Sequence, residues 1–252
     1  MPGDDYERFQ GLTYDDFRRL ASDDALSPHE RIGFPDAYRE GKDEAILADI
    51  VGKLPALADR ARIIVDIGPG CGVLALRLIA LCRDRGHALV LIDSDEMLRR
   101  LPDGADLVKI PGLYPRDASR LFDQYRGRVD AVLTYSVLQY VFAEGNVFDF
   151  VDRTLTLLAP GGRLLAGDIP NISKRKRFFT SETGVQHHQA FTGRMERPPV
   201  AFNTMEAGQI DDAVVAALLL RCRLAGFDAY VMPQAAGLPM ANRREDLLVC
   251  RP

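Results

Sequence analysis

The chain has 252 residues, of which 47% are hydrophobic and 27% charged, as in an ordinary soluble globular protein with one large domain and a small cap. The formal net charge of −4 argues against a bulk attraction to nucleic acid. No basic region leads into an apolar stretch near the N-terminus, and no apolar run approaches the roughly 18–20 residues of a membrane span. Four scattered cysteines without a CxxC pair predict reduced, mostly buried thiols, a cytoplasmic location and no zinc site.

The first 60 residues are polar and predict helices near 13–22 and 43–54, outside the main fold. A strand–helix alternation then begins. RIIVDI (62–67) is a branched apolar run typical of a strand buried on both faces. The next segment, 73–86, has apolar residues at helical spacing and ends at a glycine, which predicts a helix.

The alternation continues through four more predicted strands, separated by helices. The strands are ALVLID (88–93), DLVKI (106–110), VDAVLTY (129–135) and GRLLAGDI (162–169), and the longer helices are 116–127 and 146–159. A long helix at 211–226 precedes strands at 227–233 and 245–251, whose short connection suits an antiparallel pair. The pattern predicts a largely parallel α/β sheet, with helices on both faces and an antiparallel strand near its end. Residues 170–210 interrupt it, as a lid or binding element would.

A glycine loop, with Gly68, Gly70 and Gly72 at alternate positions, follows the first core strand. Ligands of open α/β sheets bind beyond the carboxyl ends of the strands, and glycine lets them approach the main chain closely. The dinucleotide pattern GxGxxG requires a third glycine where this chain has Val73, which disfavours an NAD-type oxidoreductase. Asp66, two residues before the loop, would crowd a pyrophosphate and suits a cationic ligand.

These residues resemble the first motif of the class I S-adenosylmethionine-dependent methyltransferases, in which the glycine loop lies against the amino-acid part of the cofactor. LIDSDEML (91–98) is similar to the family's second strand, where an acid at the position of Asp93 binds both ribose hydroxyls. The turn after strand four, LLAPGGRLLAGDI (157–169) and the reversed last strand extend the likeness.

The resemblance implies a Rossmann-like, doubly wound, mostly parallel seven-stranded sheet with a reversed last strand. It implies an N-terminal helical cap segment (1–60) and a methyltransferase domain (61–252) that carries a substrate-cap insertion (170–210). S-adenosylmethionine would be the cofactor and S-adenosylhomocysteine the product. The predicted cofactor contacts are Arg39, Asp66, Gly68, Pro69, Gly70, Gly72, Asp93, Ser94, Gly112, Leu113, Tyr135 and Ser136.

Methyl transfer from a sulfonium mainly requires the nucleophile and the methyl group to be held in line, with a base only where the nucleophile carries a proton. The candidates for that base are Asp168, His187 and His188. The turn after strand four lacks the prolines and cysteine of nucleic-acid base methyltransferases. Tyr135 and Ser136 offer no carboxylate there, so no metal is expected.

We therefore expect methyl transfer to an O, N or C atom of a small molecule, in a monomer or homodimer, with nucleic acid an unlikely partner. KRKR (174–177) is either a solvated face or a site for an acidic group, such as the phosphate or carboxylate of a sugar-like acceptor. The alternatives are a methyltransferase for tRNA or a protein side chain, and a non-catalytic partner subunit. Intact Asp66, Gly68, Gly70 and Asp93 argue against the partner subunit, because a site that had lost its function would have no physical need for them.

Overall fold

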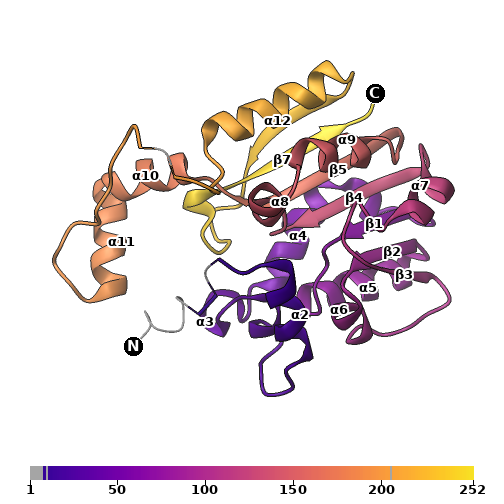
Figure 1. Cartoon of the computed structure of the whole chain (residues 1–252), viewed down its shortest axis with the longest axis horizontal. Coiled ribbons are helices and arrows are strands. Elements are labelled where there is room, and N and C mark those ends of the chain that lie inside the picture. Colours follow the sequence, from indigo (N-terminus) through magenta and orange to yellow (C-terminus); the bar gives the residue numbers. More distant parts are fainter. Residues whose placement is uncertain (1–7, 10, 205) are drawn as a thin grey trace.

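The computed structural model describes residues 8, 9, 11–204 and 206–252. Its described part contains a seven-stranded sheet in the order β3-β2-β1-β4-β5-β7-β6 (Figure 1). The strands are β1 (Ile63–Ile67), β2 (Ala88–Asp93), β3 (Leu107–Pro111), β4 (Val129–Tyr135), β5 (Leu158–Pro170), β6 (Asp228–Pro233) and β7 (Arg244–Cys250). The first five strands are parallel, and β7 runs antiparallel to both β5 and β6. The predicted fold class, including the reversed last strand, is confirmed.

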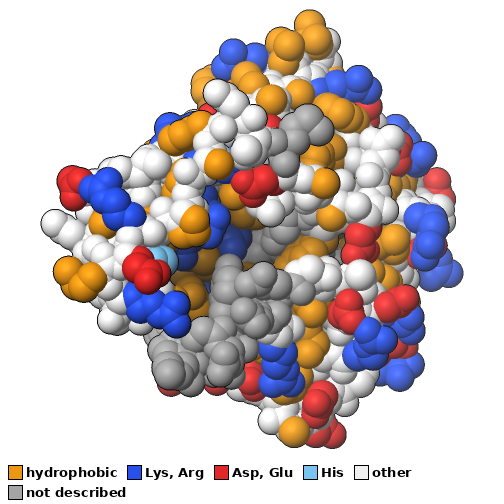
Figure 2. Space-filling model, turned by 60° about the vertical axis from the view of Figure 1, so that its left-hand side comes forward, with side chains coloured by type: hydrophobic (Ala, Val, Ile, Leu, Met, Phe, Trp, Pro, Cys, Tyr) orange, Lys and Arg blue, Asp and Glu red, His pale blue; other side chains and the backbone are white. Residues whose placement is uncertain are grey.

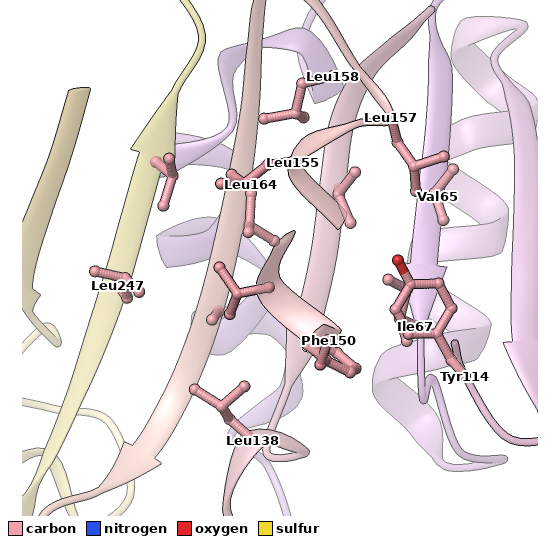
Figure 3. Close-up of a cluster of buried hydrophobic side chains, with 14 of the residues drawn as sticks. Val65, Ile67, Tyr114, Leu138, Phe150, Leu155, Leu157, Leu158, Leu164 and Leu247 are labelled. Carbon is pink, nitrogen blue, oxygen red and sulfur yellow. The ribbon is translucent and has the colours of Figure 1, made fainter. Parts of the chain in front are cut away.

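Helices cover both faces of the sheet, and each face has its own core. One face carries α4 (Asp43–Lys53), α5 (Val73–Arg85) and α6 (Asp95–Arg99), and the other α7 (Ser119–Tyr125), α9 (Val147–Leu155) and α12 (Asp212–Leu224). Alternation along β1 sends Val65 and Ile67 into the core with Phe150 of α9 (Figure 3), whereas Ile64 joins the α4–α5 core. Asp66 therefore shares the face of Ile64.

Two local predictions needed correction near the middle of the chain. The helix predicted for 146–159 ends at Leu155, and β5 begins at Leu158, which pairs with Val129 before the register shifts. The short helix α8 (Leu138–Glu144) was not predicted. Its seven residues include tyrosine, valine and phenylalanine, whose helix propensity is modest, so tertiary packing decides its conformation.

The N-terminal segment contains the predicted helices as α2 (Tyr14–Ser22) and α4, with η1 (Glu30–Ile32) and α3 (Asp36–Arg39) between them. A 3-10 turn, η2 (Pro55–Leu57), leads into β1, and η3 (Ala241–Arg243) precedes β7.

Residues 170–210 contain α10 (Ile172–Thr180) and α11 (Glu182–Thr192). We call this segment the arm, because α10 and α11 project from the edge of the molecule at the left of Figure 1.

Candidate functional site

A cavity of about 320 Å³ lies at the carboxyl ends of β1, β2 and β4. The glycine loop forms its floor, and residues that follow β2, β3 and β4 form one side. The N-terminal segment forms the other side with Tyr14, Phe17, Ile32, Phe34 and Arg39. The volume falls in the range of small-molecule sites. No described residue of the arm lines this cavity, whereas several residues of the N-terminal segment do.

Asp93 ends β2 and lines the cavity. Each of its carboxylate oxygens accepts one hydrogen bond from the protein. The N–H of Gly70 donates to Oδ2 at 2.9 Å, and the N–H of Ser94 donates to Oδ1 at 2.6 Å. Each carboxylate oxygen can accept a further hydrogen bond, so two neighbouring hydroxyl groups could be bound at once. Burial raises the pKa of Asp93 to about 6, against the opposing effect of the two N–H donors, so the group is mostly ionised at neutral pH.

The glycines of the loop pack against protein side chains. Gly68 and Gly70 adopt the left-handed region, with φ of +74° and +64°. A Cβ on Gly68 would lie 2.6 Å from Cγ2 of Val137, and Cβ atoms on Gly70 and Gly72 would each lie 2.7 Å from the side chain of Ile32. The backbone conformation and the packing therefore favour glycine at 68 and 70 even without a ligand. The premise that only a bound ligand needs them was wrong.

Arg39 forms a buried wall of the cavity and is 4% exposed. Its Nη2 donates to Ser136 Oγ at 2.8 Å and to Asp168 Oδ2 at 3.0 Å. Its guanidinium carbon lies 4.2 Å from the ring centroid of Phe34 and 5.7 Å from that of Tyr135. Its Nε–H is buried and has no hydrogen-bond partner among the described residues. The buried guanidinium group therefore places a positive charge in the wall of the cavity.

Asp168 lies behind Arg39 and does not line the cavity. Its carboxylate also accepts from the Ser136 hydroxyl, from Arg244 Nη1 at 3.2 Å and from Gln234 Nε2 at 3.3 Å. Ser136 and Asp168 both have positive φ, 61° and 58°, a costly conformation for residues with a Cβ. This geometry fits the positioning of Arg39. The role of general base stays a prediction, without a contact between Asp168 and the cavity.

Two further buried charged residues, Asp246 and Lys53, help to hold the backbone of Asp168 in place. Asp246 is fully buried and accepts from the Asp168 N–H at 2.8 Å and from Lys53 Nζ at 2.7 Å. Desolvation raises the pKa of Asp246, and Lys53 opposes that rise. Lys53 also donates to Asp49 at 2.5 Å. Every charge in this layer therefore has an opposite partner.

Two of the predicted cofactor contacts, Asp66 and Ser94, lie outside the cavity lining, which contains all the others. Asp66 is 4% exposed, and burial, followed by the charge of Asp93, raises its pKa to about 8. Its carboxyl group is thus largely protonated at neutral pH and lacks the charge for which a cationic ligand was expected. The Ser94 side chain instead caps α6 by accepting from the Met97 N–H at 3.2 Å.

The histidines proposed as bases lie on α11, away from the cavity lining. His187 and His188 pack against Phe178 and Phe179 of α10, with ring centroids 5.7 to 6.4 Å apart. Their catalytic role stays a prediction. The described residues also contain no group of three or more His, Cys, Asp or Glu side chains placed to hold a metal ion.

Sequence reasoning missed the aromatic residues that line the cavity: Tyr14, Phe17, Phe34, Tyr114, Tyr140 and Phe150. The hydroxyl of Tyr114 lies 3.0 Å from Thr154 Oγ1, and its ring packs edge-on against Phe150. The signal available in the sequence was the presence of three aromatic residues, Tyr14, Phe17 and Phe34, between positions 14 and 34 of the polar N-terminal segment. These rings make the cavity wall largely apolar.

No protein-family model matches the chain, and no curated protein matches its sequence. Solved structures do match its fold. The N-methyltransferase NodS from Bradyrhizobium japonicum, solved with S-adenosyl-L-homocysteine, is 14% identical with a TM-score of 0.54, over 95% of this chain and 98% of NodS. A SAM-dependent methyltransferase from Aquifex aeolicus is 13% identical with a TM-score of 0.52, over 89% of this chain and 98% of that one. CurJ carbon methyltransferase is 15% identical with a TM-score of 0.53, over 89% of this chain.

The chain has the fold of the class I S-adenosylmethionine-dependent methyltransferases. It spans about 61% of the length of the CurJ structure but nearly the whole of the other two. None of the helices in the described residues is long and apolar enough to cross a bilayer.

Proposed function

We propose that this protein transfers a methyl group from S-adenosylmethionine to an O, N or C atom of a small-molecule acceptor. The observation that carries the proposal is the state of Asp93. Its carboxylate lies in the same cavity as the glycine loop and keeps one acceptor position open on each oxygen. A cis diol of a nucleoside requires that arrangement.

The residues of the cavity fit the remaining parts of the cofactor. Gly112 and Leu113, after β3, provide an edge for the adenine ring, and the glycine loop borders the amino-acid end. The positive charge of Arg39, in the wall of the cavity, fits the cofactor carboxylate. When bound, S-adenosylmethionine would supply a methyl group on a positively charged sulfur. The acceptor atom would bond to the methyl carbon in line with the C–S bond, and S-adenosylhomocysteine would leave.

The chain's own contribution is positioning and exclusion of water. Tyr135 and Ser136 border the cavity at the end of β4, and Asp168 fixes both Ser136 and Arg39. The aromatic wall supplied by the N-terminal segment keeps the site dry, which strengthens the charge interactions inside it. Rigid placement of the reacting groups is a large part of catalysis for this type of displacement.

A small acceptor is supported by the closed side of the cavity and by the negative net charge of the chain. We further propose that the N-terminal segment acts as the cap. Free thiols at all four cysteines support a cytoplasmic protein.

The test is calorimetric titration with S-adenosylhomocysteine. The natural chain should bind it, and Asp93→Ala should weaken binding by about 1–3 kcal/mol because charged hydrogen bonds are lost. Asp123→Ala, an exposed acid on α7, is the matched control and should bind like the natural chain. Unchanged affinity in Asp93→Ala, or binding of NAD in place of S-adenosylhomocysteine, would overturn the proposal.

A further inference from the structure

The root of the arm holds several cationic groups close together. The guanidinium carbons of Arg175 and Arg243 lie 5.2 Å and 5.6 Å from the ring centroid of Phe179. Lys174, one residue before Arg175, donates from Nζ to the carbonyl of Arg244 at 2.7 Å. The residues come from α10 and from the segment that includes η3 and the start of β7. The fold thus gathers like charges from distant parts of the sequence.

The four basic residues of KRKR divide into two groups. Lys176 and Arg177 each form an ion pair with a carboxylate, at 2.7 Å for Lys176. Arg175 is exposed and forms no ion pair with any described residue, whereas Lys174 Nζ forms a long ion pair with Glu245 at 4.0 Å. Of the four, only Arg175 therefore lacks a carboxylate partner among the described residues, and its guanidinium group lies over the ring of Phe179.

A chain of contacts joins this cluster to the cavity. Arg244 Nη1 donates to the carbonyl of Asp168 at 2.9 Å, Asp168 accepts from Arg39 at 3.0 Å, and Arg39 lines the cavity. Figure 2 shows a hollow between the arm and the body of the molecule, with Lys and Arg side chains (blue) and hydrophobic side chains (orange) inside it.

We propose that the root of the arm, with Lys174, Arg175 and Arg243, binds one anionic group of the methyl acceptor, a phosphate or a carboxylate. This inference rests on the proposed function and specifies the acceptor. Guanidinium groups present forked donors that match the oxygens of both anions, and an ammonium adds a third donor. A long polyanion is disfavoured because the chain as a whole has a net charge of −4.

The test uses the full chain saturated with S-adenosylhomocysteine and titrated with phenyl phosphate, benzoate and the uncharged benzyl alcohol. Phenyl phosphate or benzoate should bind at millimolar concentration and benzyl alcohol should not, and the stronger of the two anions identifies the natural group. Arg175→Gln should weaken anion binding about tenfold or more, equivalent to about 1.4 kcal/mol. Arg177→Gln, on the same helix but already paired, should bind like the natural chain.

Equal anion binding in Arg175→Gln and the natural chain, or none in either, would overturn the inference. So would binding of tRNA that depends on Arg175 and is displaced by phenyl phosphate, since the acceptor would then be a nucleic acid. Affinity for S-adenosylhomocysteine, measured first in each variant, separates the two proposals. A chain that binds it normally but shows no effect at Arg175 refutes the anion site alone.

Discussion

Substitution of Asp66 by asparagine tests whether this buried acid carries a proton in the folded protein. Burial and the charge of Asp93 raise the pKa of Asp66 to about 8, from an ordinary value of 3.8. Between these two values the folded state holds a proton that the unfolded chain has lost. The free energy of unfolding should therefore fall by about 1.4 kcal/mol per pH unit in this range from Asp66 alone. This stability is fully present below about pH 4 and is lost as pH rises through 8.

Asp66→Asn removes the titratable carboxyl group and keeps the size of the side chain. The quantity of interest is how the difference in unfolding free energy changes with pH, which does not depend on how well the new amide is accommodated. The difference in unfolding free energy between variant and natural chain should shift in favour of the variant by about 3 kcal/mol from pH 5 to pH 7. Urea unfolding followed by far-ultraviolet circular dichroism measures it, because the chain has no tryptophan. Asp123→Asn should follow the natural profile. A difference that stays constant with pH would refute the reasoning and show that Asp66 is ionised in the fold.

Gly68→Ala should destabilise the protein by about 1–3 kcal/mol, because the new Cβ meets Val137 and the φ of +74° is strained, and Val137→Ala in the same chain should restore the steric part in urea unfolding. Asp246→Ala should cost about 3–5 kcal/mol by removing one of the two carboxylates of buried Lys53, with Asp246→Asn less harmful in the same assay. Affinity for S-adenosylhomocysteine should fall as pH drops through about 6, because protonation of Asp93 removes an acceptor; a calorimetric profile that is level from pH 5 to pH 8 would contradict this.

The sheet and most of its helices could be predicted from the sequence because the signals are local. Branched apolar runs mark β1 to β5, three of which (β1, β3 and β5) end at a glycine or proline, and the short connection before β7 indicates its reversal. The same local signals located Asp93 and the glycine loop at the cavity, because Asp93 ends β2, the loop follows β1, and the carboxyl ends of these strands share one edge of the sheet.

The charge states of buried groups and the residues of the cavity walls were harder to predict from the sequence, because they depend on tertiary contacts. The pattern placed Asp66 at the site, but strand alternation turns its side chain toward the α4–α5 core. Asp168 owes its environment to Arg39 and Arg244, which lie 129 and 76 residues away in sequence. The expectation that the arm covers the substrate stays a prediction; of the arm and the N-terminal segment, only the N-terminal segment contributes described residues to the cavity lining.

The contacts of Ile32 and Val137 with the glycine loop change what such a motif can be taken to mean. A descendant of this chain that had stopped using any small molecule would still be selected to keep glycine at 68 and 70, since larger residues would collide with its own interior. The presence of these glycines is thus a poor indicator of activity. A better indicator is a group in the cavity that keeps unused hydrogen-bonding positions, such as the two oxygens of Asp93, because folding alone gives no reason to retain them.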